Sequence, residues 1–91
     1  MRAEELVAEF FRRAGLTILA RNWRCRHGEI DLIADERGTL VFAEVRYRGD
    51  ARFGGAAESI TQAKRARIVA AANLYLAGRP QADCRFDVLL L

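Results

Sequence analysis

The chain has 91 residues, 52% of them hydrophobic and 30% charged, which is enough for one packed core and too little for two, so we expect a single domain over residues 1–91. Fifteen Lys and Arg residues against twelve Asp and Glu residues give a net charge of +3, which allows a nucleic-acid partner without requiring one. No apolar run approaches the roughly 20 residues of a membrane span and no charged-then-apolar leader precedes the domain, so we expect no membrane association and a cytoplasmic location.

Residues 3–14 carry the pattern of an amphipathic helix. Their apolar side chains recur at the helical spacing, at Leu6, Val7, Phe10, Phe11 and Ala14. Gly15 follows as a residue that ends helices. On a helical wheel Glu4 lies beside Phe11 at the margin of the apolar face, whereas the other two glutamates of the segment lie on the far side. We therefore expect Glu4 to be the acid of this helix that faces the interior.

Three strands in an antiparallel meander are expected next. Residues 16–26 begin with an apolar stretch and continue as a basic run. Residues 29–34 form a short apolar strand with acids in alternate positions, and residues 39–48 combine β-branched and aromatic side chains. Polar turns that contain a glycine, residues 27–28 and 35–38, join the three strands.

The second half of the chain is predicted to add a loop, a helix and a strand. Residues 49–55 contain three glycines, and we interpret them as a flap that contacts substrate. Thr61 can cap a helix that runs to Ala77 and stops at Gly78. Residues 85–91 end in an apolar run that suits the interior of a sheet. The predicted order is therefore α-β-β-β-α-β, an α+β arrangement.

Asp31 and Glu44 are carboxylates within otherwise apolar strands, where an uncompensated charge is costly. A tight hairpin would bring them side by side, and like charges at short distance raise that cost further. A magnesium or manganese ion relieves the conflict, because such hard cations accept carboxylate oxygens, a backbone carbonyl such as that of Val45, and water. A bound ion of this kind polarises phosphate and activates water for phosphodiester hydrolysis.

Periodicity alone also allows a purely structural alternative, which stays open at this point. In that alternative Asp31 pairs with an arginine across the sheet. Glu44 and Arg46 then belong to one exposed face, because strand residues two apart, from Phe42 to Arg48, project together. Buried ion pairs of this kind occur without any functional role.

Asp31, Glu44 thirteen positions later and then Arg46 resemble the D-x(n)-(D/E)-x-K signature of the PD-(D/E)XK nuclease superfamily. Nearly the whole chain is similar to the YraN-like bacterial family, uncharacterised protein family 0102, a group that resembles archaeal Holliday-junction resolvases. The blocks that carry the similarity are residues 3–4, 19–22, 28–33, 41–45, 53–54, 64 and 85–88. The resemblance implies a restriction endonuclease-like α/β core, with a mixed central sheet flanked by helices, and a metal-dependent nuclease that hydrolyses branched or single-stranded DNA.

The resemblance also implies roles for single residues. Asp31 and Glu44 take the metal-ligand positions, and Glu4 is the acid that the first helix contributes. The usual lysine of the family is Arg46 here, which can contact phosphate through its fork but stays protonated. Lys64, the only lysine, either supplies the missing amine or is a solvated helix residue. The alternatives are therefore a nucleic-acid-binding protein with this fold and weak or no catalysis, and an interaction protein without nucleic acid.

The expected nucleic-acid surface consists of Arg21, Arg24, Arg26, Arg48, Gln62 and Lys64. Trp23 lies among these arginines and either stacks on a base or packs beneath the sheet. Two further acids lie in the similar blocks, and we expect an ion pair or turn contact for Glu29 and the face opposite the metal for Asp87. Nucleases of this type often pair to cut two strands, so a homodimer is one assembly that the resemblance implies.

Overall fold

The computed structural model describes residues 3–46, 61–79 and 83–90. It contains helix α1 (Ala3–Arg13), strands β1 (Thr17–Cys25), β2 (Gly28–Glu36) and β3 (Thr39–Arg46), helix α2 (Gln62–Leu76) and strand β4 (Cys84–Leu90). This order confirms the α-β-β-β-α-β prediction, whereas the predicted flap at residues 49–55 lies outside the described residues. Within the described ranges, neither helix combines the length and the apolar character needed to cross a membrane.

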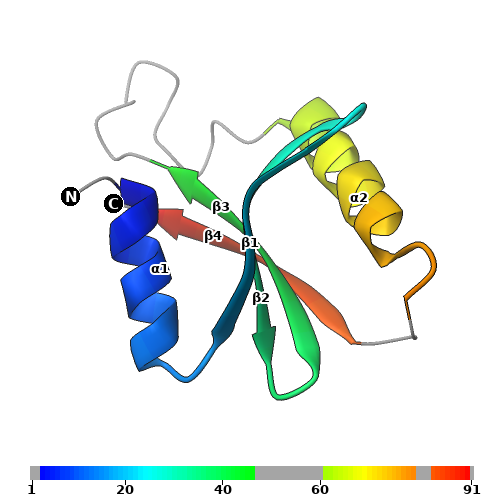
Figure 1. The fold of residues 1–91 in the computed structure, drawn as a ribbon. Coiled ribbons are helices and arrows are strands. Elements are labelled where there is room, and N and C mark those ends of the chain that lie inside the picture. The colour runs from blue at the N-terminus through cyan, green and yellow to red at the C-terminus, as the bar shows by residue number, and fades with distance from the viewer. Residues whose placement is uncertain (1–2, 47–60, 80–82, 91) are drawn as a thin grey trace.

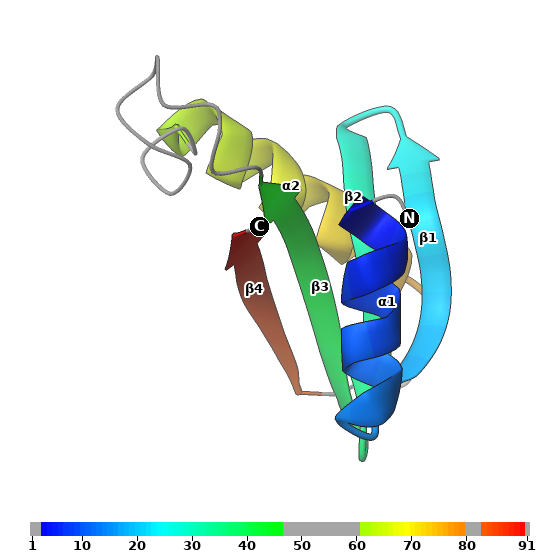
Figure 2. The same cartoon turned by 90° about the vertical axis from the view of Figure 1, so that its left-hand side faces the viewer.

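A mixed four-stranded sheet in the order β1-β2-β3-β4 forms the centre of the molecule. The first three strands are antiparallel, which confirms the meander, and β4 lies parallel to β3. Helix α1 covers one face of the sheet and α2 the other (Figure 1). Strands β1 and β4 are the two edges (Figure 2), so the predicted interior position of the last strand is wrong. The reason is the crossover through α2, which brings the chain back beside β3 and leaves β4 with that single neighbour among the described strands.

The hairpin between β2 and β3 turns at Arg37 and Gly38, whose φ angles of 51° and 95° are both positive. Two central residues with positive φ give the turn whose twist matches that of the flanking strands. Asp35 Oδ1 accepts a hydrogen bond from the Gly38 N–H at 3.2 Å. Asp35 and Glu36 are paired with β3, so the turn predicted over residues 35–38 is shorter than expected.

Each face of the sheet has its own hydrophobic cluster. The α1-facing cluster consists of Val7, Ala8, Phe11, Leu16, Leu32, Ala34, Val41, Ala43 and Val45. The α2-facing cluster consists of Ile30, Ile33, Leu40, Phe42, Ala71, Ala72 and Tyr75. Leu6, Phe10 and Ala14 of the predicted apolar stripe are exposed, so the face that α1 buries is narrower than the sequence pattern.

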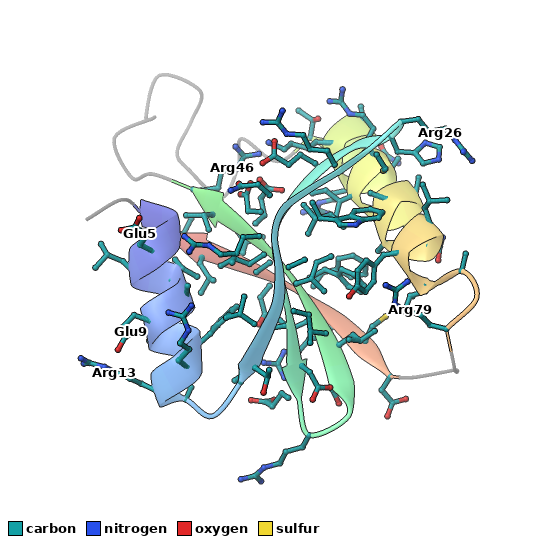
Figure 3. All side chains as sticks on the ribbon, in the orientation of Figure 1. Glu5, Glu9, Arg13, Arg26, Arg46 and Arg79 are labelled. Atoms are coloured by element: carbon teal, nitrogen blue, oxygen red, sulfur yellow. The ribbon has the colours of Figure 1, made fainter. Side chains whose placement is uncertain are left out.

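The outer side of α1 is charged, as the helical wheel predicted. Glu5, Glu9 and Arg13 point away from the sheet (Figure 3), and Glu9 pairs with Arg13 at 3.1 Å. Glu4 belongs to the first turn of this helix, and its side chain lies outside the described part of the structure.

Trp23 and the start of α2 are both fixed by local contacts. Trp23 packs against the α2-facing cluster, with its ring edge-on to that of Tyr75 at a centroid distance of 5.3 Å, so it packs beneath α2. Thr61 Oγ1 accepts a hydrogen bond from the Lys64 N–H at 3.1 Å, which confirms the predicted cap. This cap sets the first turn of α2, and therefore the position of Lys64.

Candidate functional site

The regular pairing of β2 with β3 stops next to Asp31. The ladder runs from the hairpin turn as far as the pair Leu32–Ala43. Beyond that pair, Oδ2 of Asp31 accepts a hydrogen bond from the backbone N–H of Val45 at 2.9 Å. A side-chain oxygen therefore takes the place of a backbone acceptor and is held where the two strands separate.

The alternation of side chains between the two faces also breaks at this level of the sheet. In a regular strand, residues three apart project to opposite faces. Ile30 and Ile33 nevertheless both join the α2-facing cluster, while Leu32 joins the α1-facing cluster. In β1, Asn22 has a positive φ of 52° and directly precedes Trp23, the partner of Ile30. Asparagine adopts this left-handed conformation more readily than most residues. Both strands are therefore irregular beside the site, a position where such irregularities re-aim side chains.

Glu44 is the buried acid of the site. It is 9% exposed and is the only charged residue that is buried in the described part of the chain. Burial raises the pKa of Glu44 to about 8, with further contributions from a hydrogen bond with Asp31 and from the charge of Asp31, while Arg46 opposes the shift. In the metal-free protein at neutral pH this carboxyl therefore holds a proton, and a divalent cation would take the place of that proton.

Two cations approach Glu44 without closing a tight ion pair. Arg46 Nη2 lies 3.9 Å and Lys64 Nζ lies 4.0 Å from the Glu44 Oε1 atom. Charge-assisted hydrogen bonds are shorter, at about 2.7–2.9 Å. Nε of Arg46, at the end of β3 in Figure 3, is buried and makes no hydrogen bond within the described residues. The Arg46 and Lys64 side chains are 22% and 30% exposed, so their terminal nitrogens can still donate to an anionic ligand.

Asp31, Glu44 and Lys64 line a pocket of about 360 Å³. Its walls come from the turn between β1 and β2, the start of β2, the end of β3 and the first turns of α2. The polar side chains that line it are His27, Glu29, Asp31, Glu44, Lys64 and Arg67. Three acids thus face three basic groups, and this mixture suits a metal ion together with a phosphate better than it suits an apolar ligand.

The donor set fits magnesium or manganese better than zinc. Among the side chains that the structure describes, no three His, Cys, Asp or Glu residues gather as metal ligands. Zinc sites usually need three or four protein ligands. Magnesium is held by one or two carboxylates and keeps several waters. Asp31 and Glu44 therefore have the chemistry for a magnesium site without a third protein carboxylate.

Four of the residues singled out from sequence come together here, namely Asp31, Glu44, Arg46 and Lys64. Val45 adjoins them and contributes its N–H to Asp31, whereas the predicted role of its carbonyl as a metal ligand stays a prediction. The first turn of α1, which contains Glu4, lies on the opposite face of the sheet from α2 (Figure 1).

The predicted nucleic-acid contacts are more dispersed. Arg21 is exposed on β1, Arg26 is exposed in the turn that follows β1, and Gln62 is exposed in the first turn of α2. Arg24 pairs with Glu29 at 3.4 Å, the ion pair expected for that acid. Arg48 lies outside the described residues.

Sequence reasoning missed two basic residues that line the pocket, His27 and Arg67. The sequence predicts His27 in a turn, and the turn in the structure is formed by Arg26 and His27, one residue earlier than predicted. Arg67 lies three positions after Lys64, a spacing that makes helix residues neighbours, so the sequence did contain a signal for it.

Comparison with known proteins gives one family. The sequence profile of uncharacterised protein family UPF0102 matches residues 3–91. A UPF0102 protein of Hahella chejuensis is 56% identical over an alignment of 92 positions, which covers 98% of this chain and 74% of that protein. UPF0102 proteins of Dechloromonas aromatica and Nitrosomonas europaea are 53% and 52% identical, over 98% of this chain and over 74% and 76% of their own lengths. The similarity therefore includes every element that forms the pocket.

The metal-free protein should become less stable as the pH rises, because of Glu44. Its pKa is raised from 4.5 to about 8, so between these values the folded state binds more protons than the unfolded chain does. The contribution of Glu44 to the free energy of unfolding should therefore fall across this window, by at most about 1.4 kcal/mol per pH unit. Urea unfolding in EDTA, at several pH values within the window, measures the slope.

Glu44→Gln isolates this effect, since it removes the titrating group and keeps the size of the side chain. Its free energy of unfolding should depend less on pH than that of the parent protein. Glu5→Gln, at an exposed position on α1, is the control and should leave the slope unchanged. Equal slopes in the parent and in Glu44→Gln would contradict the raised pKa.

Proposed function

Because the chain belongs to uncharacterised protein family UPF0102, whose name states no activity, we propose its function from its site: a metal-dependent nuclease that hydrolyses phosphodiester bonds of DNA. The observation that carries the proposal is the pair of carboxylates Asp31 and Glu44 at the point where β2 and β3 separate, in an open pocket that Lys64 and Arg67 also line. A structural ion pair would leave Glu44 compensated, but the nearest cationic nitrogens among the described residues lie at 3.9 and 4.0 Å.

Asp31 and Glu44 would hold the ion. When bound, a divalent cation supplies two things, polarisation of a phosphoryl oxygen and a lower pKa for an attacking water. The N–H of Val45 keeps the Asp31 carboxylate in one orientation toward the pocket. Fixed ligands of this kind need no rearrangement during the reaction, which is the main advantage of a preorganised site.

The basic residues would then bind the phosphate and orient water. Arg46 stays protonated under all ordinary conditions, so its part is to bind a phosphate oxygen. Lys64 lies 4.0 Å from Glu44 on the α2 side of the pocket, and an amine can orient the attacking water as well as carry charge. We therefore assign to Lys64 the part that the lysine of the superfamily signature would play.

A nucleic-acid-binding protein with little or no catalysis is the second candidate. Arg46 in the position of the signature lysine favours it, and so does the presence of only two close carboxylates among the described side chains. Such a protein would bind DNA in a salt-sensitive way and would bind neither magnesium nor manganese at millimolar concentration, which calorimetry can determine.

The purified protein should cut DNA when magnesium or manganese is present and should stop when EDTA is added. The substrates to compare are branched, flapped, single-stranded and duplex DNA of the same sequence. Asp31→Asn and Glu44→Gln should each lower the rate by at least about 100-fold, the scale seen when one group that stabilises a transition state is lost. Asp35→Asn, on the same strand near the hairpin turn, is the control. Cleavage that survives both site substitutions would remove this assignment.

Substitutions at Arg46 and Lys64 can distinguish the roles of these two residues. Lys64→Met should lower the cleavage rate by about 100-fold, the lower range for loss of a proton-transferring or water-orienting group. Lys64→Arg should not restore it, because arginine stays protonated and has a different shape. Arg46→Lys should keep the activity, and Asn73→Ala, exposed on the distal half of α2, should leave it unchanged. Full activity in Lys64→Met would show that Lys64 is only a solvated helix residue.

A further inference from the structure

A second hollow, of about 420 Å³, adjoins the carboxylate pocket and lies between α2 and the edge strand β4. We call it the edge groove. Glu44 and Ile68 line both hollows, so the edge groove begins where the carboxylate pocket ends. Its other walls are mainly apolar, and Val69, Phe86 and Val88 among them are each 46% exposed. The exposure arises because α2 packs over β2 and leaves the β4 side of this face less covered.

Phe86 is the aromatic surface of the edge groove. Its ring stacks on that of Phe42, with a centroid distance of 5.5 Å and an interplanar angle of 27°. Phe42 is 1% exposed and is itself in contact with Tyr75 of α2, so it supports Phe86 from the interior. Phe86 is supported on one side and is still 46% exposed, which is the arrangement that a flat ligand needs for stacking.

The charges around the edge groove suit an anionic ligand. Arg65 lines the groove itself, and Lys64 and Arg67 of the same helix line the adjoining pocket. Two acids line the groove, Glu44 at the border with the carboxylate pocket and Asp87 on β4, and Arg85 pairs with Asp87 at 3.2 Å. The ligand that matches the two hollows together therefore has a negative group in the carboxylate pocket and a flat, largely apolar group in the adjoining edge groove.

We propose that the edge groove binds an unpaired nucleobase by stacking on Phe86, so that the nucleic acid recognised by this protein is single-stranded or has an unpaired nucleotide next to the reacting phosphate. This inference rests on the proposed function and names its substrate class. Within a nucleotide the phosphate and the base are joined through one sugar, which matches two hollows that share Glu44 and Ile68. In a duplex the base is stacked and paired, and it reaches such a groove only after it is extruded.

Binding in EDTA tests the inference without cleavage. Fluorescence anisotropy at low salt compares a single-stranded oligonucleotide, the duplex of the same sequence, and a single strand of the same length with abasic sites. The parent protein should prefer the single strand over the other two probes. Phe86→Ala should weaken single-strand binding about tenfold, the scale of losing one base–aromatic stack. It should leave duplex binding unchanged, and Phe86→Trp should retain the preference.

Phe10→Ala is the matched control, since Phe10 is 60% exposed on α1, on the other face of the sheet. Far-ultraviolet circular dichroism and urea unfolding establish that each variant is folded. An unchanged single-strand affinity in folded Phe86→Ala, or an equal loss for the abasic strand, would overturn the inference. A dimer that Phe86→Ala disrupts, with single-strand binding intact, would overturn it too, because a second copy would then cover the groove.

If the nuclease proposal is wrong and the edge groove still binds unpaired bases, the experiments give a different set of results. In that case no DNA is cut with magnesium or manganese, while the preference for unpaired bases and its loss in Phe86→Ala remain, which supports the edge groove as a binding site. Cleavage that requires Asp31 and Glu44 but acts equally on duplex and single strand, with no effect of Phe86→Ala, would keep the nuclease and overturn the edge groove.

Discussion

The hydrogen bond from the Val45 N–H to the Asp31 carboxylate is the constraint on which the site depends. At this point the ladder between β2 and β3 has ended, and the side chain of one strand satisfies the backbone of the other. The strands can therefore separate without a buried N–H being left unpaired. The same bond holds Asp31 beside Glu44, so the opening of the sheet and the convergence of two acids have one structural cause.

Burial of Glu44 gives that convergence its chemical character. Two neighbouring carboxyl groups do not both ionise readily when one of them is buried, as Glu44 is. Arg46 and Lys64 lie too far from Glu44 to compensate its negative charge fully. Burial thus favours a proton on Glu44; in the proposed function a divalent cation would take its place, and the basic side chains on the pocket wall would contact phosphate. The edge groove extends this polar site with an apolar surface that ends at Phe86.

Local sequence patterns were sufficient for the order of the elements and for the convergence of the two acids. Periodicity located the helices, and a short hairpin between two apolar strands already implied that Asp31 and Glu44 are neighbours. The left-handed backbone of Asn22 could not be predicted, because asparagine permits this conformation but does not require it.

The position of β4 was predicted wrongly for a related reason. By its pattern, an apolar strand suits the interior of a sheet as well as its edge. Among the described elements α2 packs mainly against β2, and Phe86 and its neighbours are exposed. Arg67 and His27 were missed because their approach to the acids depends on how α2 and the first hairpin turn meet across the pocket. Tertiary packing, and not local propensity, determines each of these features.

Calorimetric titration with manganese tests the central claim most directly, because it asks whether the two acids form one cation site. The account predicts one ion bound per chain by the parent protein and by Asp35→Asn, and no detectable binding by Asp31→Asn or Glu44→Gln. Absence of manganese and magnesium binding to the folded parent protein at millimolar concentration, or equal binding by Glu44→Gln, would contradict it.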